Sequence, residues 1–143
     1  MRILVADDHE TVRKGVSAIL TSHKDVEVCG EAANGREAVE KANQLQPDLV
    51  ILDITMPTLN GFEAALEIRK TMPSVPILFL SMHDGRQMLQ ASKTAGVQGY
   101  ITKTQASETL LHAVDALLRG EVFFPTESSR RDLAGGSLPQ PAI

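Results

Sequence analysis

Residues 48–53 read Asp-Leu-Val-Ile-Leu-Asp, a short apolar run that ends in the carboxylate of Asp53. A second such run, Ile-Leu-Val-Ala at residues 3–6, is followed by Asp7 and Asp8. Short runs of branched apolar residues with polar ends are typical of strands buried on both faces, in parallel sheets covered by helices. Such folds place their chemistry where the parallel strands end. We therefore expect the three acids to share one cleft if the two strands are neighbours.

Three carboxylates a few ångströms apart repel one another strongly unless a cation is shared among them. Carboxylate oxygens are ligands that hard divalent ions prefer, and Mg²⁺ is the expected ion in an open site of this kind. The sequence therefore predicts a magnesium site formed by the acids that follow the two apolar runs.

Strand-like runs alternate with helical patterns along the chain, which indicates a wound α/β sheet. Strands are expected near residues 2–7, 26–31, 48–53, 75–80 and 97–102. Helices are expected near residues 10–21, 35–44, 61–71, 85–94 and 106–119. Each linking helix is long enough for the right-handed crossover between parallel strands. The expected architecture is an α/β fold with a doubly wound, five-stranded parallel sheet.

Polar residues and glycines mark several expected helix ends. Asn34 and Asn60 stand where an N-cap is needed for the second and third helices, and Gly96 follows the fourth helix as a stop. An alternative role for Asp7 and Asp8 is to cap the first helix, and a cap role for Asp8 is compatible with a metal role.

The bulk composition restricts the classes of protein that fit. A chain of 143 residues accommodates one ordinary domain plus a tail, and its net charge of −4 argues against nucleic-acid binding by this segment itself. The longest apolar runs fall short of the roughly 20 residues that a membrane span needs, and acids arrive at once after Met1, unlike in a signal peptide. We expect a cytoplasmic protein with no membrane contact.

The polar residues at the strand ends resemble those of one family, the receiver domains of two-component response regulators. The motifs that carry the resemblance are Asp7-Asp8, Asp53 followed by Met56-Pro57 and Gly61, Ser81, and Tyr100 with Lys103. The local sequence at residues 6–9, 53–57 and 80–83 is most similar to that of the NarL/FixJ group, which normally carries a C-terminal helix-turn-helix domain. The resemblance covers residues 1–122 and implies a (βα)5 flavodoxin-like (CheY-like) fold with strand order 2-1-3-4-5.

The resemblance implies a chemical role for each acid. Asp53 would accept a phosphoryl group from a sensor histidine kinase. Mg²⁺ would be held by Asp8, by Asp53 and by the backbone carbonyl of Thr55, with Asp7 acting through a water. The protein would then be a signalling switch and not an enzyme, apart from possible slow loss of its own phosphoryl group.

The remaining motif residues would contact the phosphoryl group or respond to it. Lys103 and Ser81 would contact its oxygens, and Tyr100 would turn inward as a switch. Thr55 and His83 would modulate dephosphorylation. The output surface would be the face formed by the fourth helix, fifth strand and fifth helix, where a homodimer or partner contact could form.

After residue 122 the sequence becomes rich in Ser, Gly and Pro, so residues 123–143 are expected to be a linker or disordered tail. A DNA-binding domain would lie beyond this chain, and control of transcription would depend on it. The alternative is a stand-alone receiver acting through protein-protein interaction.

A Mg²⁺-dependent aspartyl phosphohydrolase is a further alternative, although Thr55 stands where that class needs a general acid. The sequence departs from many receivers in having Thr104, and not Pro, after Lys103, so a trans or a strained bond is expected there. The histidines His9, His23 and His112 show no metal-ligand spacing and are interpreted as exposed polar residues.

Overall fold

The computed structural model describes residues 1–82 and 86–124. Strands and helices alternate in the order β1 (Arg2–Ala6), α1 (Glu10–Thr21), β2 (Glu27–Ala32), α2 (Gly35–Leu45), β3 (Leu49–Asp53), α3 (Gly61–Thr71), β4 (Ile77–Ser81), α4 (Arg86–Thr94), β5 (Gly99–Thr102), the 3-10 turn η1 (Lys103–Gln105) and α5 (Ala106–Leu118). Every element predicted from the sequence is present, and its ends differ from the predicted ones by at most two residues.

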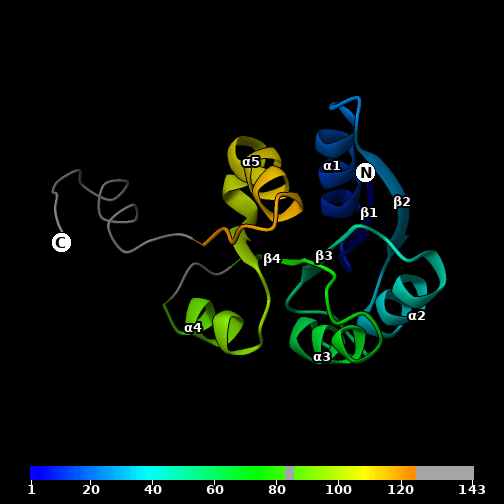
Figure 1. Cartoon of the computed structure of the whole chain (residues 1–143), viewed down its shortest axis with the longest axis vertical. Helices are drawn as coiled ribbons and strands as arrows, with labels where there is room; N and C mark the ends of the chain where they lie inside the picture. Colours follow the sequence, from blue (N-terminus) through cyan, green and yellow to red (C-terminus); the bar gives the residue numbers. More distant parts are fainter. Residues whose placement is uncertain (83–85, 125–143) are drawn as a thin grey trace, which may run out of the picture.

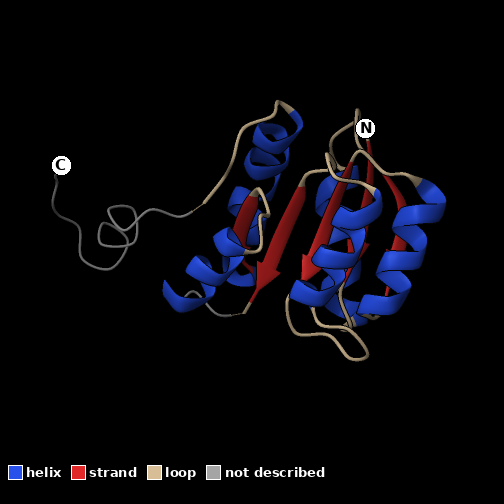
Figure 2. Ribbon diagram, turned by 60° about the horizontal axis from the view of Figure 1, so that its bottom comes forward, coloured by secondary structure: helices blue, strands red, loops and turns tan. Residues whose placement is uncertain are grey.

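The strands form one five-stranded parallel sheet in the order β2-β1-β3-β4-β5. This confirms the predicted fold class and strand order. Because all the strands run the same way, their carboxyl ends lie along one edge of the sheet (Figure 2). β1 and β3 are direct neighbours, with Ala6 opposite Leu52 in the register, so the acids after both strands start from adjacent positions.

Helices cover both faces of the sheet and divide the core in two. α1 and α5 lie on one face, and α2, α3 and α4 lie on the other (Figure 1). Leu4 and Leu52 belong to the cluster beneath α2 to α4, whereas Val5 and Ile51 belong to the cluster beneath α1 and α5. This alternation along β1 and β3 buries both faces of the strands, which is why their sequences are apolar throughout.

Local sequence signals explain several helix ends. The side chain of Asn34 accepts a hydrogen bond from the backbone N of Glu37 at 2.8 Å, and Asn60 forms a reciprocal capping box with Glu63. Gly96 adopts a positive φ of 80° after α4, as a left-handed stop requires. These predictions are confirmed.

The alternative cap role for the first two acids is wrong. The N-cap of α1 is His9, whose side chain makes no cap hydrogen bond. Its backbone N instead donates to Asp7 Oδ1 at 2.8 Å, outside the helix. The side chains of Asp7 and Asp8 are therefore available for contacts other than capping α1.

The chain returns to the edge of the sheet after α5. Phe123 forms a parallel bridge with Gly99, its N donates to the carbonyl of Gln98 at 2.9 Å, and its carbonyl accepts from the N of Tyr100 at 3.0 Å. Phe123 packs against the core cluster under α5, and Phe124 packs against the cluster on the α4 side. The described structure thus continues two residues past the predicted boundary at residue 122.

Within the described part of the chain, every helix is too short or too polar to cross a lipid bilayer.

Candidate functional site

The acids that the sequence analysis selected meet at the carboxyl edge of the central strands. Asp7 and Asp8 follow β1, and Asp53 is the last residue of β3. Asp7 is 0% exposed and Asp53 is 3% exposed, whereas Asp8 lies nearer the surface. The prediction that the three acids share one place is therefore confirmed by the geometry.

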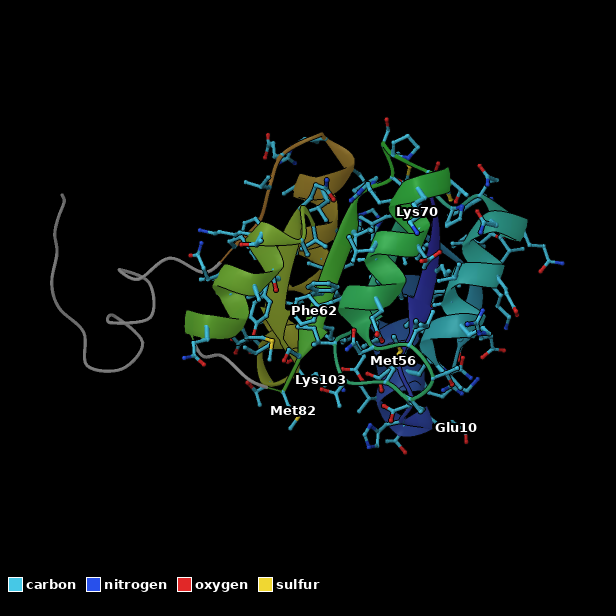
Figure 3. The ribbon with its side chains drawn as sticks, turned by 90° about the horizontal axis from the view of Figure 1, so that it is seen from below. Glu10, Met56, Phe62, Lys70, Met82 and Lys103 are labelled. Carbon is cyan, nitrogen blue, oxygen red and sulfur yellow. The ribbon has the colours of Figure 1, made fainter. Side chains whose placement is uncertain are left out.

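Lys103 brings a positive charge into this group from the edge strand β5. It is the first residue after β5, and its Nζ lies 2.9 Å from Asp7 Oδ2 and 3.4 Å from Asp53 Oδ1. Figure 3 shows Lys103 at the same end of the molecule as Met56 and Met82, which lie in the segments after β3 and β4. The ammonium group therefore neutralises part of the charge of two buried carboxylates.

The surroundings of Asp53 make its ionisation costly. Burial is the largest cause, the charge of Asp7 is the next, and together they outweigh the attraction of Lys103 and raise the pKa of Asp53 to about 6. For Lys103, burial alone would lower the pKa, but the close contact with the Asp7 carboxylate and the charge of Asp53 raise it above its usual value. The lysine is thus held as a cation, while Asp53 ionises around pH 6.

One oxygen of this cluster lacks a proper hydrogen bond. Asp7 Oδ2 is close to Lys103 Nζ, yet the contact is an ion pair whose angles are not those of a hydrogen bond, and this buried oxygen has no other partner among the described residues. A buried carboxylate oxygen in this state is costly unless a cation interacts with it. The Lys103 ammonium at 2.9 Å supplies such a cation, and a metal ion beside Asp7 would add to it.

The donor atoms suit a hard divalent cation. Asp7, Asp8, His9 and Asp53 each offer a ligand atom, and these atoms all lie within 4.8 Å of one another. Carboxylate oxygens are the ligands that Mg²⁺ prefers, so the three acids fit that ion. The residues present are therefore compatible with the predicted magnesium site.

His9 lies closer to the acids than the sequence analysis predicted. Its Nδ1 is 3.1 Å from Asp8 Oδ1, although the side chain is 70% exposed, as expected for a polar surface residue. An imidazole nitrogen is a poor ligand for Mg²⁺. In the sequence, His9 directly follows Asp7 and Asp8, and this adjacency could have indicated that its side chain lies beside Asp8.

The loop after β3 is folded tightly onto the strand end. The N of Gly61 donates to the carbonyl of Ile54 at 2.7 Å, and a Cβ at Gly61 would lie 2.6 Å from the carbonyl oxygen of Asp53. Only glycine tolerates so close an approach. Met56 is buried in the core and anchors the same loop. The motif Met56-Pro57 and Gly61 therefore fixes the backbone around Asp53.

The other predicted site residues are distributed around Asp53. The backbone N of Thr55 donates to Asp53 Oδ1 at 3.4 Å, and the Thr55 side chain is exposed. Ser81 ends β4, the strand beside β3, and is buried. Tyr100 is 0% exposed and belongs to the core, more deeply buried than a half-covered edge residue. His83 lies outside the described residues.

The bond between Lys103 and Thr104 is trans, one of the two expected outcomes, and the peptide bonds of the described residues include no cis bond. Lys103 and Thr104 both belong to the short turn η1, and Thr102 precedes it as the last residue of β5. The Oγ1 atoms of Thr102 and Thr104 lie 3.2 Å apart. This turn leads directly into α5.

Comparison with known proteins gives a consistent result. A family model described as the response regulator receiver domain matches residues 3–115. The response regulator protein VraR of Staphylococcus aureus is 39% identical over 127 residues, which are 89% of this chain and 61% of VraR. The chain therefore spans less than two thirds of the length of that relative.

Solved structures agree in fold. A LuxR-family two-component response regulator from an Aurantimonas species superimposes with a TM-score of 0.84 at 32% identity, covering 93% of this chain and 94% of that one. The isolated receiver (REC) domain of RcsB from Salmonella enterica serovar Typhimurium, in the presence of the phosphomimetic BeF3−, gives a TM-score of 0.82 at 29% identity, covering 92% and 96%. The signal receiver domain of the putative response regulator NarL of Mycobacterium tuberculosis gives 0.80 at 30% identity, covering 84% and 97%.

Proposed function

This chain belongs to the response regulator receiver domain family, and we propose from that premise that Asp53 accepts a phosphoryl group from a sensor histidine kinase. The observation that carries the proposal is the position of Lys103, whose ammonium lies within ion-pair distance of both Asp7 and Asp53 in a group of three acids. A cation shared by two buried carboxylates suits a site that receives further negative charge.

The proposed reaction is a phosphoryl transfer between side chains. A carboxylate oxygen of Asp53 forms a bond to phosphorus as the phosphorus–nitrogen bond of a phosphohistidine breaks, and the released imidazole nitrogen takes a proton. With a pKa of about 6, Asp53 is largely ionised above neutral pH and is available as the acceptor. Lys103 can shift from Asp53 Oδ1 toward an oxygen of the new phosphoryl group, and the hydroxyl of Ser81 can donate to another.

We assign the cation to the three acids of the site. Asp8, Asp53 and the backbone carbonyl of Thr55 would hold Mg²⁺, with Asp7 acting through a water. When bound, the ion supplies positive charge that offsets repulsion between the carboxylates and the phosphoryl oxygens. The preference of Mg²⁺ for oxygen ligands matches the carboxylates of the donor set. Thr55 and His83 are the residues that would set the lifetime of the phosphoryl group.

The consequence of phosphorylation would reach the face formed by α4, β5 and α5. A phosphoryl group adds close to two negative charges and three acceptor oxygens, which draw Ser81 and Lys103 toward it. Tyr100 belongs to β5, one of the elements of that face, and its backbone N donates to the carbonyl of Phe123. A repacking around Tyr100 would therefore also move the segment that leads out of the domain.

We propose that this output controls transcription in a longer cytoplasmic protein. The chain spans 61% of the length of VraR, and related solved proteins include a LuxR-family regulator. DNA would be bound by a C-terminal domain beyond this chain, and the α4–β5–α5 face would support a homodimer. The receiver unit, predicted as residues 1–122, would include Phe123 and Phe124 as well; the rest of the predicted linker or tail lies outside the described residues.

Labelling distinguishes the proposal from its alternatives. The protein is incubated with Mg²⁺ and acetyl phosphate, or with a phosphorylated histidine kinase, and its intact mass is measured. One phosphoryl group per chain, lost in Asp53→Asn and retained in the exposed control Asp25→Asn, is the expected result. Repeated turnover of a small phosphate ester would indicate a phosphohydrolase, and absence of labelling would indicate an interaction module that is not phosphorylated.

A further inference from the structure

Asp7 is held in place by its backbone as well as by its side chain. Its N donates to the carbonyl of Ala32 in β2 at 3.0 Å, and its carbonyl oxygen accepts a hydrogen bond from Nη1 of Arg13 at 2.8 Å. Asp7 is the first residue after β1, so the partner of its carbonyl decides how the chain leaves the strand. Arg13 therefore fixes the peptide that carries the most buried acid of the site.

Arg13 is itself fixed from the other side. Its Nε donates to Glu31 Oε1 at 2.8 Å, and its side chain is only 15% exposed. The other carboxylate oxygen of Glu31 accepts from the hydroxyl of Ser17 at 3.2 Å, and Lys14 Nζ lies 3.4 Å from Oε1. These hydrogen bonds lower the pKa of Glu31, although burial acts in the opposite direction as the largest single effect. Glu31 is thus a charged anchor on β2.

The planar guanidinium is what allows both contacts at once. Nε and Nη1 of Arg13 point in fixed directions, one to Glu31 and the other to the Asp7 carbonyl. A lysine carries the same charge, but its single ammonium on a flexible stem does not reproduce this fork. The geometry therefore joins α1, β2 and the end of β1 through one side chain.

We propose that Arg13 is a positioning residue of the phosphorylation site, and this inference rests on the proposed function. It is not in contact with Asp53 in the described structure, and it acts by fixing the Asp7 peptide. The Asp7 carboxylate then keeps Oδ1 on the N of His9 and Oδ2 toward Lys103. Loss of the fork lets Asp7 reorient and weakens the binding of a cation by the acids.

Arg69 provides a matched control. It also donates to backbone carbonyls, with Nη1 bonded to Pro73 at 3.0 Å and to Val75 at 2.6 Å. Arg69 lies near the C-terminal end of α3. The next residue, Lys70, is at the end of the molecule opposite Lys103 in Figure 3. Replacing Arg69 removes a comparable structural clamp without touching the acids.

The test compares the full 143-residue chain with Arg13→Met, Arg13→Lys and Arg69→Met. Mg²⁺ alone is titrated by calorimetry, and exchange of the His9 amide is measured by NMR without metal. Outer-shell partners of a metal site typically change affinity by roughly 10- to 100-fold, so we expect about tenfold weaker Mg²⁺ binding in Arg13→Met. Faster exchange of the His9 amide is expected in the same variant. Arg69→Met should lower the melting temperature and leave both measurements within about twofold of the wild type.

Arg13→Lys tests the fork and also serves if Arg13→Met fails to fold. We expect this variant to bind Mg²⁺ at least about threefold more weakly than the wild type. Lysine keeps the positive charge of Arg13, so the loss would come from the missing guanidinium fork. Wild-type affinity in either Arg13 variant would overturn the positioning role while leaving the proposed function intact. A wild-type protein that does not bind Mg²⁺, or is not labelled on Asp53, would overturn the proposed function itself.

Discussion

Replacing Asp53 by Asn should stabilise the fold at neutral pH, because the native protein holds this carboxylate at a cost. Its pKa is raised from 3.8 to about 6, a difference of about 2 pH units. Each unit corresponds to about 1.4 kcal/mol, so ionised Asp53 destabilises the folded state by up to about 3 kcal/mol. A neutral Asn of the same shape avoids this cost.

The pH dependence follows from the direction of the shift. Between about pH 4 and pH 6 the folded protein binds the Asp53 proton more tightly than the unfolded chain does, so the stability of the wild type falls as pH rises through that window. Above pH 6 the full cost is present. The gain from Asp53→Asn should therefore be about 1–3 kcal/mol at pH 7.5 and about a third of that value at pH 4.5.

Urea unfolding followed by circular dichroism measures this gain, since the chain has no Trp to report by fluorescence. Asp25→Asn, which replaces an exposed acid in the turn before β2, is the control and should change the free energy of unfolding by less than about 0.5 kcal/mol at either pH. An Asp53→Asn protein that is less stable than the wild type at pH 7.5 would refute the reasoning. A gain of equal size at pH 4.5 would refute it as well.

Three further perturbations test other parts of the structure. Lys103→Met should lower the free energy of unfolding by about 2–4 kcal/mol at pH 7.5, because the buried acids lose their counter-charge. The loss should be smaller by about 1 kcal/mol or more in a protein that already carries Asp53→Asn. Strictly additive effects of the two substitutions in urea unfolding would contradict the ion pair. Asn60→Ala removes the cap of α3 and should cost about 1 kcal/mol in the same assay, equally with and without Mg²⁺; no loss would show that the capping box is dispensable. Phe124→Ala removes a half-buried ring whose centroid lies 5.3 Å from Lys93 Nζ. It should speed hydrogen exchange of the Tyr100 amide, which donates to the carbonyl of the neighbouring Phe123. Unchanged protection of that amide would mean that the ring does not hold this segment on β5.

The fold was predictable from the sequence because its signals are local. The apolar runs of β1 and β3 differ from surface strands in having no polar alternation, and this follows from burial on both faces. Asn34 and Asn60 marked two helix starts because a side-chain oxygen at the cap satisfies an N–H within the same turn. Such signals need no knowledge of distant parts of the chain.

The details of the site depend on contacts between distant residues, and these were predicted less well. The family resemblance placed Lys103 near Asp53, but its shorter contact is with Asp7, which no spacing in the sequence indicates. The link from Arg13 to the Asp7 carbonyl was missed because a backbone oxygen leaves no trace in a side-chain motif. The pairing of Phe123 with β5 was missed because three apolar residues before a proline are also compatible with the start of a linker.

A crystal structure of the protein grown with Mg²⁺ and beryllofluoride tests the central claim most directly. We expect a beryllofluoride group on Asp53, with Mg²⁺ beside it held by Asp8 and the Thr55 carbonyl, and Lys103 turned toward a fluorine. Beryllofluoride absent from Asp53 in saturated crystals, or an ion bound away from the three acids, would contradict it.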